Sequence, residues 1–184
     1  TYCYQAQSGT GKTGAFTIGT LGQIDTSNKN IQAIILTPTR ELSKQTHTVL
    51  NELGKLMKGL KVTLLVGGTS IDDDIAELKK RPQIIVGCPG RINDMVRRKR
   101  LNLGSVSVVV LDEADEMLSK GFKEQIYNIF YNLDEENVQI ALFSATMSQD
   151  LIDLSKKLLR DPIKILVKSE ALSLEGIGQY YVLQ

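Results

Sequence analysis

Five short apolar runs constrain the fold of this chain more than any other feature. They are continuous rather than alternating, which is typical of strands covered on both faces. Stretches with helical spacing of apolar residues lie between and after them, at 40–57 and 151–158. Strands that alternate with helices indicate parallel βαβ units, so we predict an α/β fold, a doubly wound parallel sheet with helices on both faces. The runs are 34–36, 64–66, 84–86, 108–111 and 140–143.

Length and composition fit one such domain. The 184 residues are 42% hydrophobic and 23% charged, which is typical of a globular protein with one core. No apolar run approaches the ~18 residues of a membrane helix, so we expect no membrane partner. The net charge of +1 provides no global basic field, and any nucleic-acid site must be local. The two cysteines match neither a disulfide framework nor a zinc pattern, which favours a reducing compartment.

Residues 6–13 read AQSGTGKT, a P-loop with alanine in place of the usual first glycine. The glycines let successive backbone N–H groups turn toward phosphate oxygens, and the following helix directs its positive dipole end to the same anion. We expect Lys12 to neutralise the β- and γ-phosphates of a nucleotide and Thr13 to bind Mg²⁺. A glycine-rich turn that merely caps a helix is the alternative. The predicted phosphate-binding residues are Ser8, Gly9, Thr10, Gly11, Lys12 and Thr13.

An acidic segment, Asp112-Glu113-Ala114-Asp115, directly follows the fourth apolar run. A carboxylate at the end of a buried strand is costly unless it meets a cation. We therefore predict that Asp112 holds Mg²⁺, largely through water and together with Thr13. Glu113 follows at the position of a general base for the attacking water. Lys12, Asp112 and Glu113 are the predicted catalytic residues, and a plain acidic helix start is the alternative.

Three other strand ends are followed by proline, glycine or arginine. Bare backbone N–H groups and arginines at such ends suit a sugar–phosphate chain and carry no base information. Taken singly, each segment is more typical of a turn or of a helix start, with Thr39 as an N-cap of the helix from Arg40. Asp72-Asp73-Asp74 is likewise interpreted as a helix first turn rather than a metal site. The predicted contact residues are Pro38, Thr39, Arg40, Gly67, Gly68, Pro89, Gly90 and Arg91.

Ser144-Ala145-Thr146 follows the fifth apolar run. Its two hydroxyl groups are suited to hydrogen-bond Asp115, which would link the nucleotide site to the rest of the domain. A small-residue turn that caps the next helix explains the segment equally well. Both interpretations stay open at this point.

These motifs in this order resemble the DEAD-box family of ATP-dependent RNA helicases. The resemblance covers nearly the whole chain through AQSGTGKT, PTREL, GG, PGR, DEAD and SAT. Segments 112–118, 121–127, 161–168 and 174–177 are similar to the translation initiation factor 4A subgroup. The family implies a RecA-like fold, ATP and Mg²⁺ as cofactors, and RNA held along its backbone by the eight contact residues. It also implies that Asp115, Ser144 and Thr146 couple hydrolysis to strand separation.

The resemblance implies a domain organisation as well. Residues 1–168 would form the ATP-binding domain, truncated before the family's adenine-reading glutamine motif, and 169–184 a linker and the start of a second RecA-like domain. An arginine finger from that second domain is worth about 10³-fold or more in kcat. We therefore expect the chain alone to hydrolyse ATP negligibly. In two positions the chain departs from the family, with Cys88 for the usual threonine and Ser43 for the usual alanine.

The expected function is local unwinding of RNA duplexes in translation initiation, in the cytoplasm. Expected partners are RNA, the second RecA-like domain and scaffold proteins of the initiation complex. The alternative is an ATP-gated RNA clamp that acts as an assembly platform, as in a nuclear, exon-junction-type helicase. A GTPase is disfavoured, because the Asn-Lys-x-Asp guanine reader is absent: residues 28–31 read NKNI.

Overall fold

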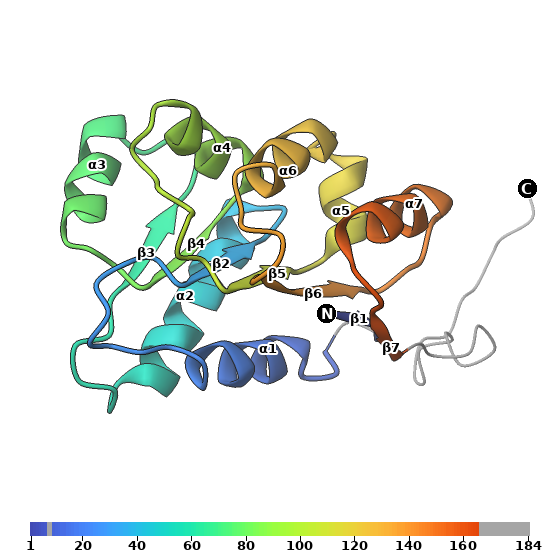
Figure 1. The fold of residues 1–184 in the computed structure, drawn as a ribbon, viewed down its shortest axis with the longest axis horizontal. Coiled ribbons are helices and arrows are strands. Elements are labelled where there is room, and N and C mark those ends of the chain that lie inside the picture. Colours follow the sequence, from blue (N-terminus) through green and yellow to red (C-terminus); the bar gives the residue numbers. More distant parts are fainter. Residues whose placement is uncertain (7–8, 166–184) are drawn as a thin grey trace, which may run out of the picture.

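The computed structural model describes residues 1–6 and 9–165. In this part of the chain, seven strands form one parallel sheet in the order β3-β4-β2-β5-β6-β1-β7 (Figure 1). The predicted linker at 169–184, and residues 166–168 before it, lie outside the described residues. The strands are Tyr2–Gln5 (β1), Ala33–Leu36 (β2), Val62–Leu65 (β3), Ile84–Gly87 (β4), Val108–Leu111 (β5), Gln139–Ser144 (β6) and Ile163–Ile165 (β7).

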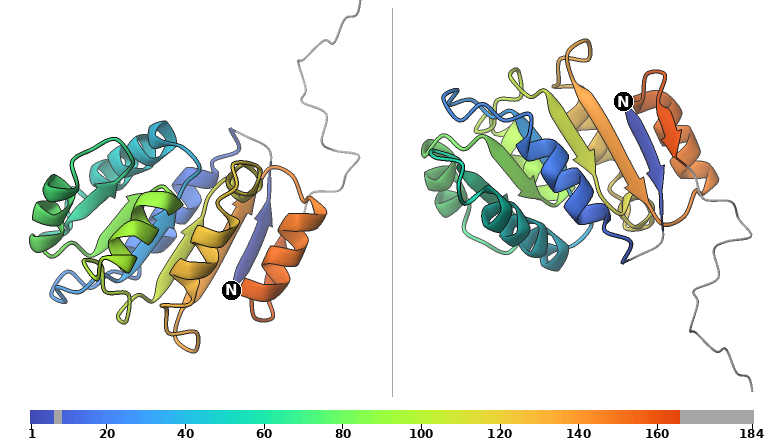
Figure 2. Two further views of the ribbon diagram at one scale, coloured as in Figure 1. Left: turned by 90° about the horizontal axis from the view of Figure 1, so that it is seen from above. Right: turned by 90° about the horizontal axis from the view of Figure 1, so that it is seen from below.

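Seven helices in the described residues cover the two faces of the sheet (Figures 1 and 2). The first two helices, α1 and α2, pack on one face, and the other five pack on the opposite face. The predicted doubly wound α/β fold is therefore confirmed. The helices are Lys12–Leu21 (α1), Arg40–Gly54 (α2), Ile71–Lys79 (α3), Pro89–Arg97 (α4), Ala114–Ser119 (α5), Lys123–Phe130 (α6) and Gln149–Leu158 (α7).

The apolar runs are continuous because alternate residues of each central strand enter two separate cores. In β2, Ile34 belongs to the core under α4–α7, whereas Ile35 belongs to the core under α1 and α2. Both side chains are fully buried. Complete burial of an isoleucine contributes about 1.5–3 kcal/mol, so the central strands stabilise both layers at once.

The apolar face predicted for α2 is only partly correct. The helical spacing over 40–57 includes Leu50, Leu53 and Leu56. Leu50 is buried, but Leu53 is 50% exposed and Leu56, which lies beyond the end of α2, is 86% exposed. The helix instead buries a stripe of small residues, including Gly54 at its end. A Cβ on Gly54 would lie 2.4 Å from Leu60 Cδ2. The close approach requires small side chains, and the leucine spacing therefore gave a misleading signal.

The carboxyl ends of the strands lie at one edge of the sheet, where ligands bind in folds of this type. The P-loop follows β1, and the acidic segment follows β5, two strands away, with β6 between them. The segment 37–39 follows β2 on the other side of β5. All predicted motifs therefore lie at the same edge. None of the described helices is long and apolar enough to cross a lipid bilayer.

Candidate nucleotide site and adjoining groove

The P-loop owes its shape to two glycines with left-handed backbone conformations. Gly9 and Gly11 have φ values of 80° and 86°, which other residues rarely adopt. An added Cβ at either position would meet nothing within 4 Å, so the requirement is conformational rather than steric. Gly11 is the N-cap of α1, and no side chain of the described residues caps this helix. Its first amide groups are therefore directed toward the loop, as an anion site requires. Ser8 lies outside the described residues.

Lys12 joins the P-loop to the acidic segment. Its side chain is 5% exposed, and Nζ lies 3.1 Å from Glu113 Oε1. The same ammonium group donates to the carbonyl oxygen of Ala6 at 3.0 Å. These partners hold the charge at the end of the sheet, between β1 and β5. They are also groups that a nucleotide phosphate would have to replace.

Asp112 is a strongly desolvated carboxyl group at the end of β5. The residue is 4% exposed, and burial raises its pKa to about 6, with the negative charge of Glu113 adding to the rise and Lys12 opposing it. A buried acid in this state gains from a divalent cation. Asp112 and the Thr13 hydroxyl are the hard oxygen donors that Mg²⁺ prefers. Among the described residues, no group of three or more acidic, histidine or cysteine side chains is arranged to hold a metal ion by itself.

Glu113 has an unusual backbone conformation. Its φ and ψ are 50° and 53°, in the left-handed region, at the N-cap of α5. Its amide donates to Asp112 Oδ1 at 3.1 Å, while its side chain, 21% exposed, reaches Lys12. Such strain in a residue other than glycine is often found at functional sites. Here the turn separates the buried carboxylate of Asp112 from the partly exposed carboxylate of Glu113.

Asp115 connects the acidic segment to the loop after β6. Thr146 donates to Asp115 Oδ2 from both its hydroxyl, at 2.6 Å, and its amide, at 3.1 Å. Ser144 Oγ instead donates to the carbonyl oxygen of Thr146 at 2.8 Å. Burial raises the pKa of Asp115, but the hydrogen bonds that its carboxylate accepts, above all from Thr146, outweigh burial, and the net pKa is lowered. The structure thus contains the link from Thr146 to Asp115; a coupling role remains a prediction.

A groove of about 720 Å³ adjoins the site at the carboxyl ends of β2, β3 and β4. The structure brings six of the eight predicted contact residues to its wall. Of the other two, Gly68 lies beside the wall in the same turn as Gly67, and Pro89 is buried at the start of α4. The lining residues are Pro38, Thr39, Arg40, Glu41, Gly67, Cys88, Gly90, Arg91, Asp94, Lys120 and Phe122.

Arg40 explains the pair Gly67-Gly68. A Cβ on Gly68 would lie 2.5 Å from Arg40 Nη1, and Gly68 has φ of 87°. A larger residue at this position would displace the guanidinium group from the turn and would be strained by the positive φ. The predicted cap is present too, because Thr39 accepts from the amide of Leu42 at 3.2 Å. Arg40 is exposed, and among the described residues its guanidinium group makes no ion pair, so it is free to meet an anion.

Sequence reasoning missed Lys120 and Phe122, which line the groove from the turn between α5 and α6. Lys120 makes a weak, half-exposed ion pair with Glu116 at 3.3 Å. The turn depends on Gly121, with φ of 78°. Gly121, just after the end of α5, is the sequence feature that could have predicted this turn, because glycine commonly ends a helix.

Together, the fold and the phosphate site define a P-loop domain of the RecA-like class, in which a nucleotide binds at the end of a parallel sheet. Within this class, the chain belongs to the DEAD/DEAH box helicase family, whose model, described as "DEAD/DEAH box helicase", matches residues 1–154.

Individual relatives agree with this assignment. The chain is 52% identical over 178 residues to the ATP-dependent RNA helicase eIF4A of Schizosaccharomyces pombe, with 97% of this chain and 45% of that protein covered. It is 50% identical to the protein of the same name from Neurospora crassa, with 97% and 44% covered. The chain thus spans less than half the length of these curated relatives.

Solved structures share the fold. A DEAD box protein from the hyperthermophile Methanococcus jannaschii matches with a TM-score of 0.86 and 41% identity, over 92% of this chain and 46% of that one. A Saccharomyces cerevisiae Dbp5 variant, bound to RNA and ADP BeF3, matches with a TM-score of 0.84 and 33% identity, over 97% and 44%. The expected RecA-like architecture is confirmed.

Proposed function

We propose that this domain is the ATP-binding half of an ATP-dependent RNA helicase that couples ATP hydrolysis to local unwinding of RNA duplexes in translation initiation. The observation that carries the proposal is the juxtaposition, at one edge of the sheet, of a phosphate site around Lys12 and Asp112 and a groove lined by the exposed cation Arg40. The proposal is supported by sequence identity of 50% and 52%, over 178 residues, to proteins named ATP-dependent RNA helicase eIF4A.

The chemistry follows from an exchange of partners. Lys12 is held by Glu113 and the Ala6 carbonyl oxygen. When phosphate oxygens take over the ammonium group, Glu113 loses its counter-charge and its carboxylate becomes available to accept a proton from the attacking water. Mg²⁺, held by Thr13 and Asp112 largely through water, would neutralise charge on the phosphate oxygens. The amides of Gly9 to Thr13 supply further donors at the start of α1.

The RNA side uses backbone contacts. Arg40, the Gly67-Gly68 turn and the start of α4 form walls of one groove, and such groups bind phosphate and sugar irrespective of sequence. The hydrogen bond from Thr146 to Asp115 lies between the nucleotide site and the rest of the domain, where it would transmit the nucleotide state. A second RecA-like domain, initiation-complex scaffold proteins and a cytoplasmic location complete the proposal.

ATP binding is tested by Lys12→Ala with Lys55→Ala, an exposed lysine at the end of α2, as the matched control. A fluorescent ATP analogue with Mg²⁺ reports affinity. Loss of a charged hydrogen-bond donor weakens binding about 10- to 100-fold, whereas Lys55→Ala binds like the parent chain. Equal affinities of the two variants would show that the phosphate site is misassigned.

RNA binding is tested by titrating a short single-stranded RNA into the isotope-labelled chain and following amide NMR signals, which detect weak complexes. Arg40→Ala should lower both the affinity and the slope of its salt dependence, the latter by about 0.7 for one lost phosphate contact on a single strand. Lys55→Ala should change neither. A parent chain whose groove amides do not move at any RNA concentration contradicts the proposal.

A further inference from the structure

Asp74 is the only buried member of the acidic first turn of α3. It is 4% exposed, whereas its neighbours Asp72 and Asp73 are both exposed. Acidic residues at a helix start are ordinarily explained by the helix dipole. The helix dipole explains the exposed Asp72 and Asp73, but it does not explain why Asp74 is buried away from water.

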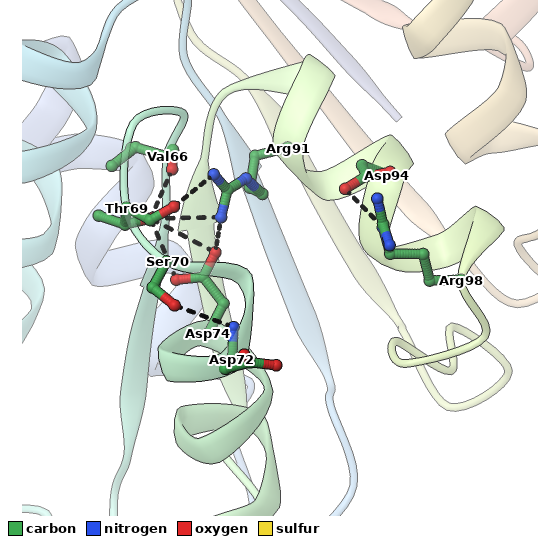
Figure 3. A network of polar contacts seen from close by, with 8 residues as sticks. All are labelled: Val66, Thr69, Ser70, Asp72, Asp74, Arg91, Asp94 and Arg98. Carbon is green, nitrogen blue, oxygen red and sulfur yellow. Dashed lines mark hydrogen bonds and ion pairs between the residues drawn. The ribbon is translucent and has the colours of Figure 1, made fainter.

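The carboxylate of Asp74 is buried because it joins two turns of the groove (Figure 3). It forms an ion pair with Arg91, whose side chain is 10% exposed. Thr69 Oγ1 lies 3.2 Å from Asp74 Oδ1 and 2.9 Å from the carbonyl oxygen of Val66. Arg91 Nη2 donates to the carbonyl oxygen of Thr69 at 2.9 Å. One buried pair thus ties the turn after β3 to the start of α4.

We propose that Asp74 is a positioning residue for the RNA groove: it fixes Arg91 and Thr69, and so holds the Gly67-Gly68 turn at a set distance from the start of α4. This inference rests on the proposed function. Asp74 itself does not line the groove, so it acts only through the residues that it holds.

The energetics favour geometry over stability as the reason for this pair. Desolvation of two charges offsets most of their attraction, and a buried ion pair is often no more stable than apolar side chains of the same size. What the pair provides is a fixed arrangement, because a guanidinium group with three defined partners has one orientation. Arg91 and Thr69 each contact both the carboxylate and one another.

The fixed arrangement matters because the Arg40 side chain packs against this turn. The Arg40 guanidinium group lies against Gly67 and Gly68, within 2.5 Å of where a Cβ of Gly68 would be. If the turn moves away from α4, this cation moves with it, while Gly90 at the start of α4 stays. A phosphate chain could still contact both walls, but binding would then cost the free energy needed to bring them back to the set distance.

The experiment compares Asp74→Asn with Asp73→Asn in the complete 184-residue chain. Both variants remove one negative charge from the same helix turn, so any general electrostatic gain for RNA is matched. Thr69→Val, which loses the hydroxyl at constant charge and similar shape, tests the same network if Asp74→Asn folds poorly. Each variant is titrated with single-stranded RNA by amide NMR at several salt concentrations.

We expect Asp74→Asn and Thr69→Val to bind RNA about threefold or more weakly than Asp73→Asn. Their salt-dependence slope should equal that of Asp73→Asn, because no phosphate contact is removed, in contrast to the lower slope of Arg40→Ala. In the free chain, the amide signals of Gly67, Gly68 and Gly90 should shift in the first two variants only. Asp74→Glu, which keeps the carboxylate, should recover most of the affinity.

The outcomes separate the inference from the function on which it rests. If the parent chain and Asp73→Asn bind no RNA, the proposed function fails. If they bind RNA and folded Asp74→Asn and Thr69→Val bind it equally well, the positioning role is wrong while the function stands. A lower salt slope for Asp74→Asn or Thr69→Val would also overturn the inference, because it would mean that a direct phosphate contact was lost.

Discussion

Replacing Asp112 by asparagine should stabilise the free domain at neutral pH. The carboxyl group is buried at the end of β5, and its pKa of about 6 stands well above its ordinary value of 3.8. The folded state therefore favours the protonated acid: the stability that this group contributes is complete below pH 3.8 and is lost as pH rises through about 6. Asparagine is neutral at every pH and can still accept the hydrogen bond from the Glu113 amide, so it avoids the loss.

The magnitude follows from the two pKa values. With 3.8 in the unfolded chain and about 6 in the folded one, ionisation costs about 3 kcal/mol of folding free energy at pH 7.5 and about 1 kcal/mol at pH 4.5. Asp112→Asn should accordingly gain about 3 kcal/mol at the higher pH and about 1 kcal/mol at the lower. Against a total stability of about 5–15 kcal/mol, the first figure is a large fraction.

Urea unfolding measures the free energy of unfolding at both pH values. Far-UV circular dichroism is the probe, because the chain contains no tryptophan for fluorescence. Magnesium and nucleotide must be absent, because a bound cation would lower the pKa of Asp112. Asp73→Asn, at an exposed position, is the control and should change little at either pH. A variant no more stable than the parent at pH 7.5, or a gain that does not shrink toward pH 4.5, would refute the argument from desolvation.

Three further substitutions test local features. Lys99 has φ of 56° directly after the C-cap of α4, so Lys99→Gly should raise stability by about 0.5–1 kcal/mol in urea unfolding. No gain would show that the left-handed turn is not strained. Cys88 makes no side-chain cap at the N-cap of α4, and Cys88→Ser should add one and about 1 kcal/mol; an unchanged midpoint contradicts this. Thr146→Val removes the 2.6 Å bond that helps to lower the pKa of Asp115. It should cost about 1 kcal/mol at pH 7, a difference that disappears as pH falls through that lowered pKa.

The sheet was predictable because both faces of its central strands are covered by apolar cores. A strand such as β4, buried on both faces, has a continuous run of apolar residues. At the edge the signal fails. In β7 the residues Ile163, Lys164 and Ile165 are all exposed, and its pairing with β1 depends on a neighbour far away in the sequence.

The site was predictable where chemistry demands a residue type at a given spacing. A phosphate-binding turn needs glycine at Gly9 and Gly11, whatever the rest of the chain does. Contacts between segments that are distant in the sequence could not be predicted in this way. The burial of Asp74 depends on Arg91, seventeen positions later, and nothing in three successive aspartates distinguishes the one that meets this arginine. The motif containing Arg91 led to a predicted RNA contact, which stays a prediction, but not to the ion pair that holds this side chain.

The nucleotide site combines several features that each oppose folding. Asp112 is ionised with difficulty, Glu113 has a left-handed backbone, and Lys12 is held away from water. The Lys12–Glu113 pair offsets part of this cost, because each charge is the other's nearest compensation in the free domain. In the proposed function, a nucleotide with Mg²⁺ would present phosphate oxygens to Lys12 and a cation to Asp112, and would so satisfy both buried charges more completely. The same interactions that make the free site unfavourable would thus become binding energy for the ligand, and Glu113, left without its partner, would be the base that the proposal requires.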